Sequence, residues 1–80
     1  MLQELIKTVE NHFNRIEVKD NLVILDGITL RVNEKYIIDK YGRDHVNTEV
    51  FINKNLRPVT IYDGNEAKGI EILLNRLGVK

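Results

Sequence analysis

The densest group of reactive side chains in this chain lies in one short polar stretch, Asp39 to His45. His45 follows Asp44 directly, and we expect it to lie within reach of Glu49. An imidazole beside carboxylates is a combination that binds a metal ion or acts as a general base. A catalytic centre, however, needs several groups held in place together, and a solvated loop with a surface ion pair is the commoner arrangement. Both interpretations stay open, and the solvated loop is favoured.

Motifs of the known catalytic machineries are missing from the sequence. The chain has neither cysteine nor serine, so it lacks the usual nucleophiles of acyl transfer. The pairs Asp26-Gly27 and Asp63-Gly64 are typical of turns and helix caps, and they do not form a phosphate-binding glycine loop. We therefore expect a protein that is not an enzyme and that uses no cofactor or metal ion.

The charge balance bears on which partners the chain can attract. Twelve basic residues offset twelve acidic ones, which removes the overall attraction to phosphate on which most binders of nucleic acid or anionic membranes rely. Four cations and two tyrosines do fall close together in the sequence: Arg31, Lys35, Tyr36, Lys40, Tyr41 and Arg43. Acidic residues are interleaved with them and cancel their field, so a mixed solvated face is favoured. Nucleic-acid binding is therefore the least favoured alternative.

Length and composition indicate one small globular domain, residues 1–80. Apolar residues make up 42% of the chain and charged residues 30%, which is enough for one core and unlike a disordered segment. The amphipathic N-terminal segment does not resemble a signal peptide, and no apolar run approaches the roughly 20 residues of a membrane span. Together with the absence of cysteine, these features predict a protein of the reducing cytoplasm.

The spacing of apolar residues predicts a helix at each end of the chain. Apolar side chains at helical intervals favour a first helix over 2–13. A second amphipathic helix begins near an N-terminal box at 63–66, with Asp63 or Asn65 as its cap, and ends before Gly78. Gly69 in its middle weakens the helix, which suggests a close approach to the sheet.

Between the two helices the pattern predicts short strands. They are expected over 15–19, 22–25, 28–32, 35–39, 48–53 and 58–62. Asp26-Gly27 predicts a type I′ hairpin turn, because both residues tolerate a positive φ. Asn33-Glu34 is interpreted as a second turn, and Pro58 suggests that the last strand lies at a sheet edge.

The predicted fold is a small α+β domain. It consists of an antiparallel meander of strands with the N- and C-terminal helices packed on one face. The core is expected to contain nine apolar residues: Leu5, Val9, Phe13, Ile28, Leu30, Val32, Ile70, Leu73 and Leu77.

The strand Leu22–Leu25 does not fit a sheet with one open face. It is apolar at every position, as in strands that are covered on both sides. Its second face, together with Phe51, is therefore either a homodimer contact, a surface for another protein, or a face covered by another part of the chain.

Two stretches of the chain are LQELIKTVEN at Leu2 to Asn11, and ITLRVN with the following YII between Ile28 and Ile38. In these stretches the chain resembles small phage-encoded anti-CRISPR proteins that inhibit Cas9. The resemblance implies a helix before an antiparallel sheet, and a turn whose acidic and amide groups imitate DNA at the site that reads the target-adjacent motif. Carried over to this chain, Asn33 and Glu34 would be the matching turn residues.

The favoured function is therefore a phage- or prophage-derived, non-enzymatic inhibitor that binds a protein of its bacterial host, with Cas9 as one candidate. Six residues are predicted to contact that partner: Asn33, Glu34, Tyr36, Tyr41, Arg43 and Asp44. A small homodimeric structural or regulatory domain is the alternative.

Overall fold

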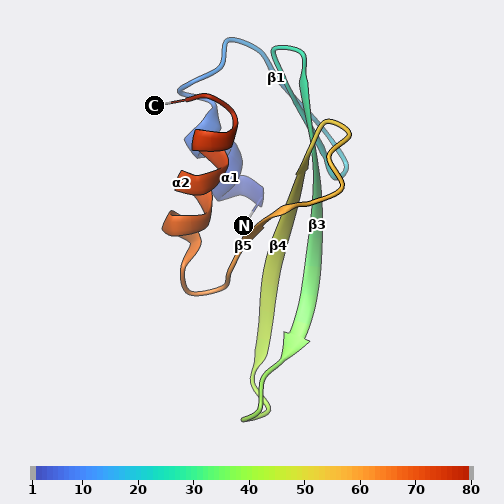
Figure 1. The fold of residues 1–80 in the computed structure, drawn as a ribbon, viewed down its shortest axis with the longest axis vertical. Helices are drawn as coiled ribbons and strands as arrows, with labels where there is room; N and C mark the ends of the chain where they lie inside the picture. The colour runs from blue at the N-terminus through green and yellow to red at the C-terminus, as the bar shows by residue number, and fades with distance from the viewer. Residues whose placement is uncertain (1, 80) are drawn as a thin grey trace.

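The computed structural model describes residues 2–79. Along this part of the chain a helix comes first, five strands follow, and a second helix comes last (Figure 1). The elements are α1 (Leu2–Val9), β1 (Ile16–Lys19), β2 (Leu22–Leu25), β3 (Ile28–Ile38), β4 (Asp44–Ile52), β5 (Val59–Ile61) and α2 (Glu66–Arg76).

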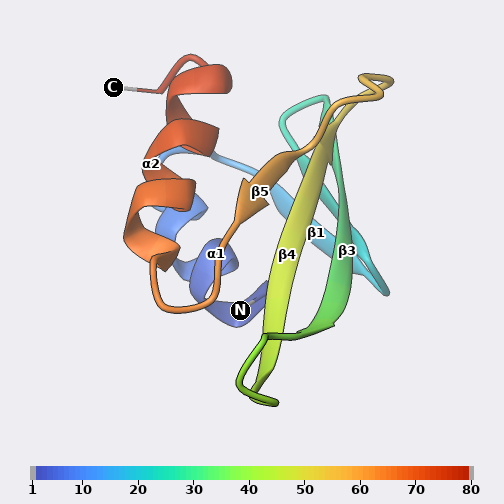
Figure 2. The same cartoon turned by 60° about the horizontal axis from the view of Figure 1, so that its bottom comes forward.

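The strands form one sheet in the order β1-β2-β3-β4-β5, and each is antiparallel to its neighbours. Figure 2 shows both helices on the same side of this sheet. The predicted α+β meander with two helices on one face is therefore confirmed. β5 is an edge strand, as Pro58 suggested. Neither of the two helices is long and apolar enough to cross a membrane.

The turn at Asp26-Gly27 has the predicted type I′ character, because φ is +37° at Asp26 and +91° at Gly27. The Asp26 carboxylate also accepts hydrogen bonds from the backbone N–H groups of Asn14, at 3.1 Å, and Arg15, at 2.9 Å. This turn therefore closes the β2–β3 hairpin and fixes the segment that enters β1 from α1.

The core lies between the helices and the facing side of the sheet. Five of the nine predicted core residues are buried there: Leu5, Val9, Leu30, Val32 and Leu73. The other four are half-buried and pack against this cluster: Phe13, Ile28, Ile70 and Leu77. The prediction missed five buried residues that come from three strands, β2, β4 and β5: Val23, Leu25, Val50, Val59 and Ile61.

Two predicted boundaries are wrong. α1 ends at Val9, four residues before the predicted end, and a hydrogen-bonded turn follows it up to His12. Asn33-Glu34 is not a turn, because β3 continues through both residues to Ile38 and pairs with β4 along this whole stretch. Neither residue is a glycine or proline, so nothing in the backbone interrupts the strand.

α2 lies directly on the edge strand β5. A methyl group on Gly69 would lie 2.8 Å from the Ile61 Cα atom, so the missing side chain permits the close approach that the sequence suggested. The helix ends in a Schellman motif: Gly78 has φ +82°, its N–H donates to the Asn75 carbonyl, and the Val79 N–H donates to Leu74. At the other end Asn65 occupies the cap position, but its side chain makes no capping hydrogen bond.

β2 lies inside the sheet, between β1 and β3. Val23 and Leu25 point into the core and are buried, whereas Leu22 and Ile24 are half-buried on the face without helices. On that face Arg31 stacks on Phe51, with its guanidinium carbon 4.3 Å from the ring centre. Both edges of β2 are therefore paired, and only its outward side chains can contact another molecule.

Candidate functional site

The two longest strands extend beyond the rest of the sheet. β2 pairs with β3 only as far as Arg31, and β5 pairs with β4 only between Thr48 and Val50. Residues 33–47 therefore form a two-stranded hairpin, which we call the arm. The molecule measures 42 × 23 × 21 Å, and the arm projects along the long axis (Figure 1).

The tip of the arm, Asp39 to Arg43, is tied by hydrogen bonds to a single aspartate. The Asp39 N–H donates to the Arg43 carbonyl, and one Asp39 carboxylate oxygen accepts from the N–H groups of Tyr41, at 2.8 Å, and Arg43, at 2.9 Å. Gly42 supplies the positive φ, +77°, that closes the turn. The sequence predicted that the next strand begins at residue 48, but β4 already begins at Asp44.

His45 connects the tip to the segment before α2. Its Nε2 lies 2.8 Å from the second carboxylate oxygen of Asp39, and its Nδ1 lies 3.3 Å from a carboxylate oxygen of Asp63. The Asp63 N–H in turn donates to the Asn47 side-chain carbonyl. We call Asp39, His45 and Asp63 the His45 brace, because together they hold the base of the tip.

The brace favours its charged form. The hydrogen bond to Asp39 is the main cause that raises the pKa of the His45 imidazole, and the bond to Asp63 adds to it while partial burial opposes it. The same hydrogen bond, followed by the N–H of Arg43, lowers the pKa of the Asp39 carboxyl. A protonated His45 between two carboxylates is the stable state of this cluster below the raised pKa.

These partners are not the ones that the sequence suggested for His45. Alternation along β4 directs Asp44 to the opposite face of the strand, and Glu49 instead accepts a hydrogen bond from the Asn33 side-chain amide at 3.1 Å. The two brace carboxylates bind opposite ring nitrogens, so the imidazole separates them. In residues 2–79 no group of three or more histidine, cysteine, aspartate or glutamate side chains is arranged to hold a metal ion.

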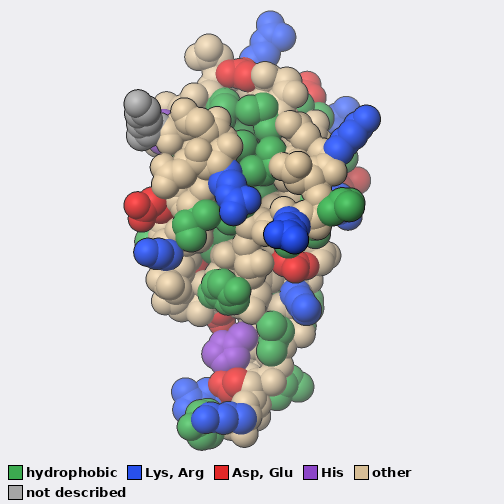
Figure 3. All heavy atoms as spheres, viewed as in Figure 1, with side chains coloured by type: hydrophobic (Ala, Val, Ile, Leu, Met, Phe, Trp, Pro, Cys, Tyr) green, Lys and Arg blue, Asp and Glu red, His purple; other side chains and the backbone are tan. Residues whose placement is uncertain are grey.

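The arm presents aromatic and aliphatic side chains to solvent. Tyr41 is 68% exposed at the tip, with the Lys40 Nζ atom 5.1 Å and the Arg43 guanidinium carbon 5.4 Å from its ring centre. In Figure 3 the end of the arm is covered by lysine and arginine side chains around a hydrophobic one. Along the helix-side face of β3, Tyr36 is 76% and Ile38 is 70% exposed.

All six predicted contact residues lie on the arm, but they do not form one patch. Glu34 and Tyr36 share the helix-side face, where the Tyr36 hydroxyl donates to the Glu34 carboxylate at 3.2 Å, and Asp44 lies on that face near the tip. Asn33 lies on the opposite face, and Tyr41 and Arg43 belong to the tip.

The sequence prediction missed Ile38 and Asp63. On its face of β3, Glu34 separates Ile38 from the apolar alternation of Ile28, Leu30 and Val32, and the pattern does not indicate that Ile38 is exposed on an arm. Asp63 looked like a helix cap, and only the fold brings it to His45.

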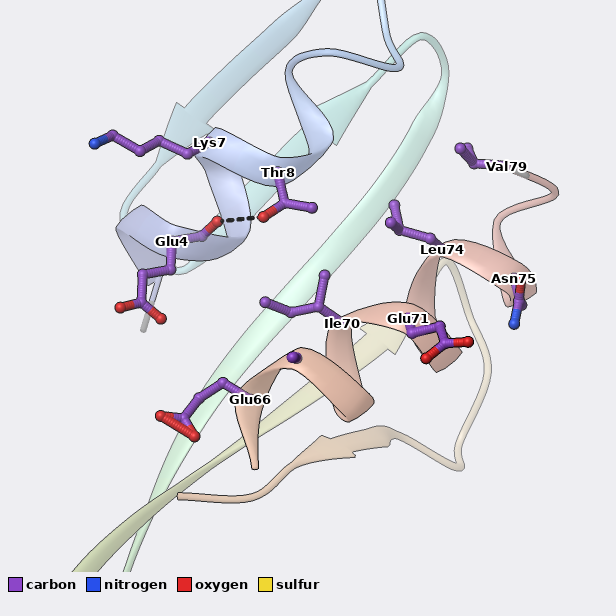
Figure 4. Close-up of a pocket in the computed structure, with 10 residues that line it drawn as sticks. Glu4, Lys7, Thr8, Glu66, Ile70, Glu71, Leu74, Asn75 and Val79 are labelled. Atoms are coloured by element: carbon purple, nitrogen blue, oxygen red, sulfur yellow. Dashed lines mark hydrogen bonds between the residues drawn. The ribbon is translucent and has the colours of Figure 1, made fainter. Parts of the chain in front are cut away.

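A concave surface lies between the two helices. It is a groove of about 720 Å³ whose floor contains Ile70 and Leu74 and whose rim contains Glu4, Glu66 and Glu71 (Figure 4). The interpretation of the sequence treated the helices only as cover for the sheet and gave no indication of this groove.

Comparisons with protein-family models, with curated proteins and with solved structures found no match to this chain.

Proposed function

We propose that this protein is a non-enzymatic binding module that inhibits a protein of a bacterial host, in whose cytoplasm it acts, and that the arm is its contact element. The observation that carries the proposal is the exposure of Tyr36 and Tyr41 on a hairpin that projects from the body. Tyrosine and arginine are the residues that most often anchor protein interfaces, because they bury a large area and carry a polar end.

The arm is held by hydrogen bonds within this chain, without a partner. Asp39 fixes the tip through two backbone N–H groups, and the His45 brace ties its base to Asp63. An ordered contact element loses less conformational entropy on binding than a flexible loop would. This supports a role for the tip in recognition rather than as a solvated loop.

The kind of partner surface follows from the side chains at the tip. Lys40 and Arg43 flank Tyr41 there, so the partner is expected to present acidic groups around an apolar pocket. A phage or prophage origin and Cas9 as a candidate target are parts of this proposal that come from the resemblance. Imitation of DNA by an acidic turn is not part of it, because Asn33 and Glu34 lie within β3.

The test is a pull-down from bacterial lysate with the tagged protein, with a Cas9–guide complex supplied as a defined bait. Tyr41→Ala and Tyr36→Ala are each expected to reduce the amount of captured protein at least tenfold. Tyr62→Ala is the matched control, because Tyr62 is 57% exposed outside the arm. Equal capture by all three variants would exclude the arm as the contact element.

The second candidate is a homodimeric structural or regulatory domain that uses the outward side of Leu22–Leu25. Half-buried Leu22 and Ile24 on the helix-free face favour it. It predicts that Ile24→Lys converts a dimer into a monomer, as measured by light scattering. A nucleic-acid binder, the least favoured function, predicts steeply salt-dependent binding to DNA or RNA.

A further inference from the structure

In the part of the chain that the structure describes, no strand lies beside the outer edge of the arm along β3. Val32 donates its N–H to the Asn21 carbonyl, which ends the contact with the β1–β2 hairpin. The backbone groups of Thr29 and Asp39 form their hydrogen bonds on the other side of β3, toward β4, with Asn53 and Arg43. Since backbone groups alternate along a strand, the N–H and C=O groups of Glu34, Tyr36 and Ile38 point away from β4. No strand within residues 2–79 pairs with them.

An isolated two-stranded ribbon is marginally stable in water, and a strand edge with exposed apolar side chains is a template for further pairing. From Asn33 to Ile38 every side chain of β3 is exposed, including Tyr36 and Ile38. We propose that two copies of this chain pair edge to edge through this stretch and form a symmetric dimer with a four-stranded arm.

The register of the dimer follows from the backbone. A two-fold axis at Tyr36 places Glu34 of one copy opposite Ile38 of the other and the two Tyr36 residues opposite each other. In this register the backbone groups of Glu34, Tyr36 and Ile38 that point away from β4 all meet the corresponding backbone groups of the second copy. It puts no like charges opposite one another and brings two tyrosines together as a cross-strand aromatic pair.

The charges at the ends of the paired segment are complementary. Beyond Ile38 the chain reaches Lys40, which in this register arrives at the β1–β2 turn of the second copy. There a notch of about 320 Å³ is lined by Asp20, Asn21, Val32, Asn33 and Glu34. The carboxylates of Asp20 and Glu34 in this notch are therefore available to bind the lysine, and the two-fold axis repeats this contact at the other end of the paired segment.

The experiment is sedimentation equilibrium of the purified protein up to millimolar concentration, where the expected mass is twice the 9.3 kDa of the chain. Tyr36→Pro removes an N–H that no strand within residues 2–79 pairs with, so the variant is expected to stay folded by circular dichroism but to be monomeric. Tyr36→Ala is the matched control: it lacks the ring but keeps the N–H, and it should dimerise at least tenfold more tightly than Tyr36→Pro. Lys40→Glu should weaken the dimer, and the double variant Lys40→Glu/Glu34→Lys should restore it.

A wild-type protein that stays monomeric at millimolar concentration would overturn the proposal. So would a dimer that Tyr36→Pro leaves intact, and a dimer that only Ile24→Lys dissociates would belong to the helix-free face. Because the measurement needs no other protein, its outcome is independent of whether the tip binds a host partner.

Discussion

Replacing Gly69 by alanine should destabilise this protein although it improves the helix. The added Cβ would lie 2.8 Å from the Ile61 Cα, 2.9 Å from its Cγ1 and 3.0 Å from its Cβ. Carbon atoms pack best at about 3.5–4.0 Å, so α2 would have to move outward by roughly 0.7 Å or more. Such overpacking costs about 1–3 kcal/mol, whereas glycine to alanine within a helix gains about 1 kcal/mol. The free energy of unfolding should therefore fall by about 1 kcal/mol.

For a domain of this size that loss lowers the melting temperature by about 4–8 °C. Thermal and urea unfolding followed by circular dichroism measure it, with Asn75→Ala as the control on an exposed position of the same helix. The control gains helix propensity without a clash, so it should melt at or slightly above the wild-type temperature. If Gly69→Ala melts as high as the control, α2 does not contact β5 at this distance and the argument fails.

Three further changes test the core and the brace. Thr48 is fully buried, and its hydroxyl has no hydrogen-bond partner among the described residues. Thr48→Val should therefore raise the free energy of unfolding by about 1 kcal/mol in urea titrations, and a lower free energy of unfolding would show that the hydroxyl has a partner. Leu30 is also fully buried, and Leu30→Asp should abolish the cooperative thermal transition; a wild-type melt would mean that the strand register is wrong. Since the pKa of His45 is raised in the fold, its charged contacts stabilise the protein below the unfolded value of 6.5 and are lost as the pH rises through the raised pKa. The melting-temperature advantage of wild type over His45→Gln should therefore shrink between about pH 5 and about pH 8, and an advantage that is equal at both would refute the charged brace.

The features that the sequence predicted well depend on neighbouring residues. Asp26-Gly27 makes a type I′ turn because its two positive φ values need nothing beyond these residue types. Gly78 ends α2 for the same reason, and Gly69 permits the approach to β5 because the position has no side chain. The apolar periodicities of the helices and strands were enough to predict a meander with two helices on one face.

The features that it missed depend on distant partners. β3 runs through Asn33-Glu34 because nine consecutive residue pairs join it to β4, and a pairing of that length outweighs the turn preference of asparagine. Asp63 does not cap α2; its carboxylate binds the imidazole of His45 instead, eighteen positions away in sequence. Neither outcome has a local signature.

The exposure of the arm shows how far an alternating pattern can be trusted. Leu30, Val32, Tyr36 and Ile38 share one face of β3, yet the first two are buried and the last two are 76% and 70% exposed. The difference lies in what covers them, because the helices cover the body of the sheet and the arm extends beyond them (Figure 1).

Natural proteins usually protect such an edge with charges, a proline or a covering segment. Along Asn33–Ile38 the only charged side chains are Glu34 and Lys35, and no proline interrupts the strand. In a domain with so small a core, two large exposed apolar side chains on an open edge leave a hydrophobic surface that favours association. Contact with another chain would account for this surface, and both proposals for the arm rest on that argument.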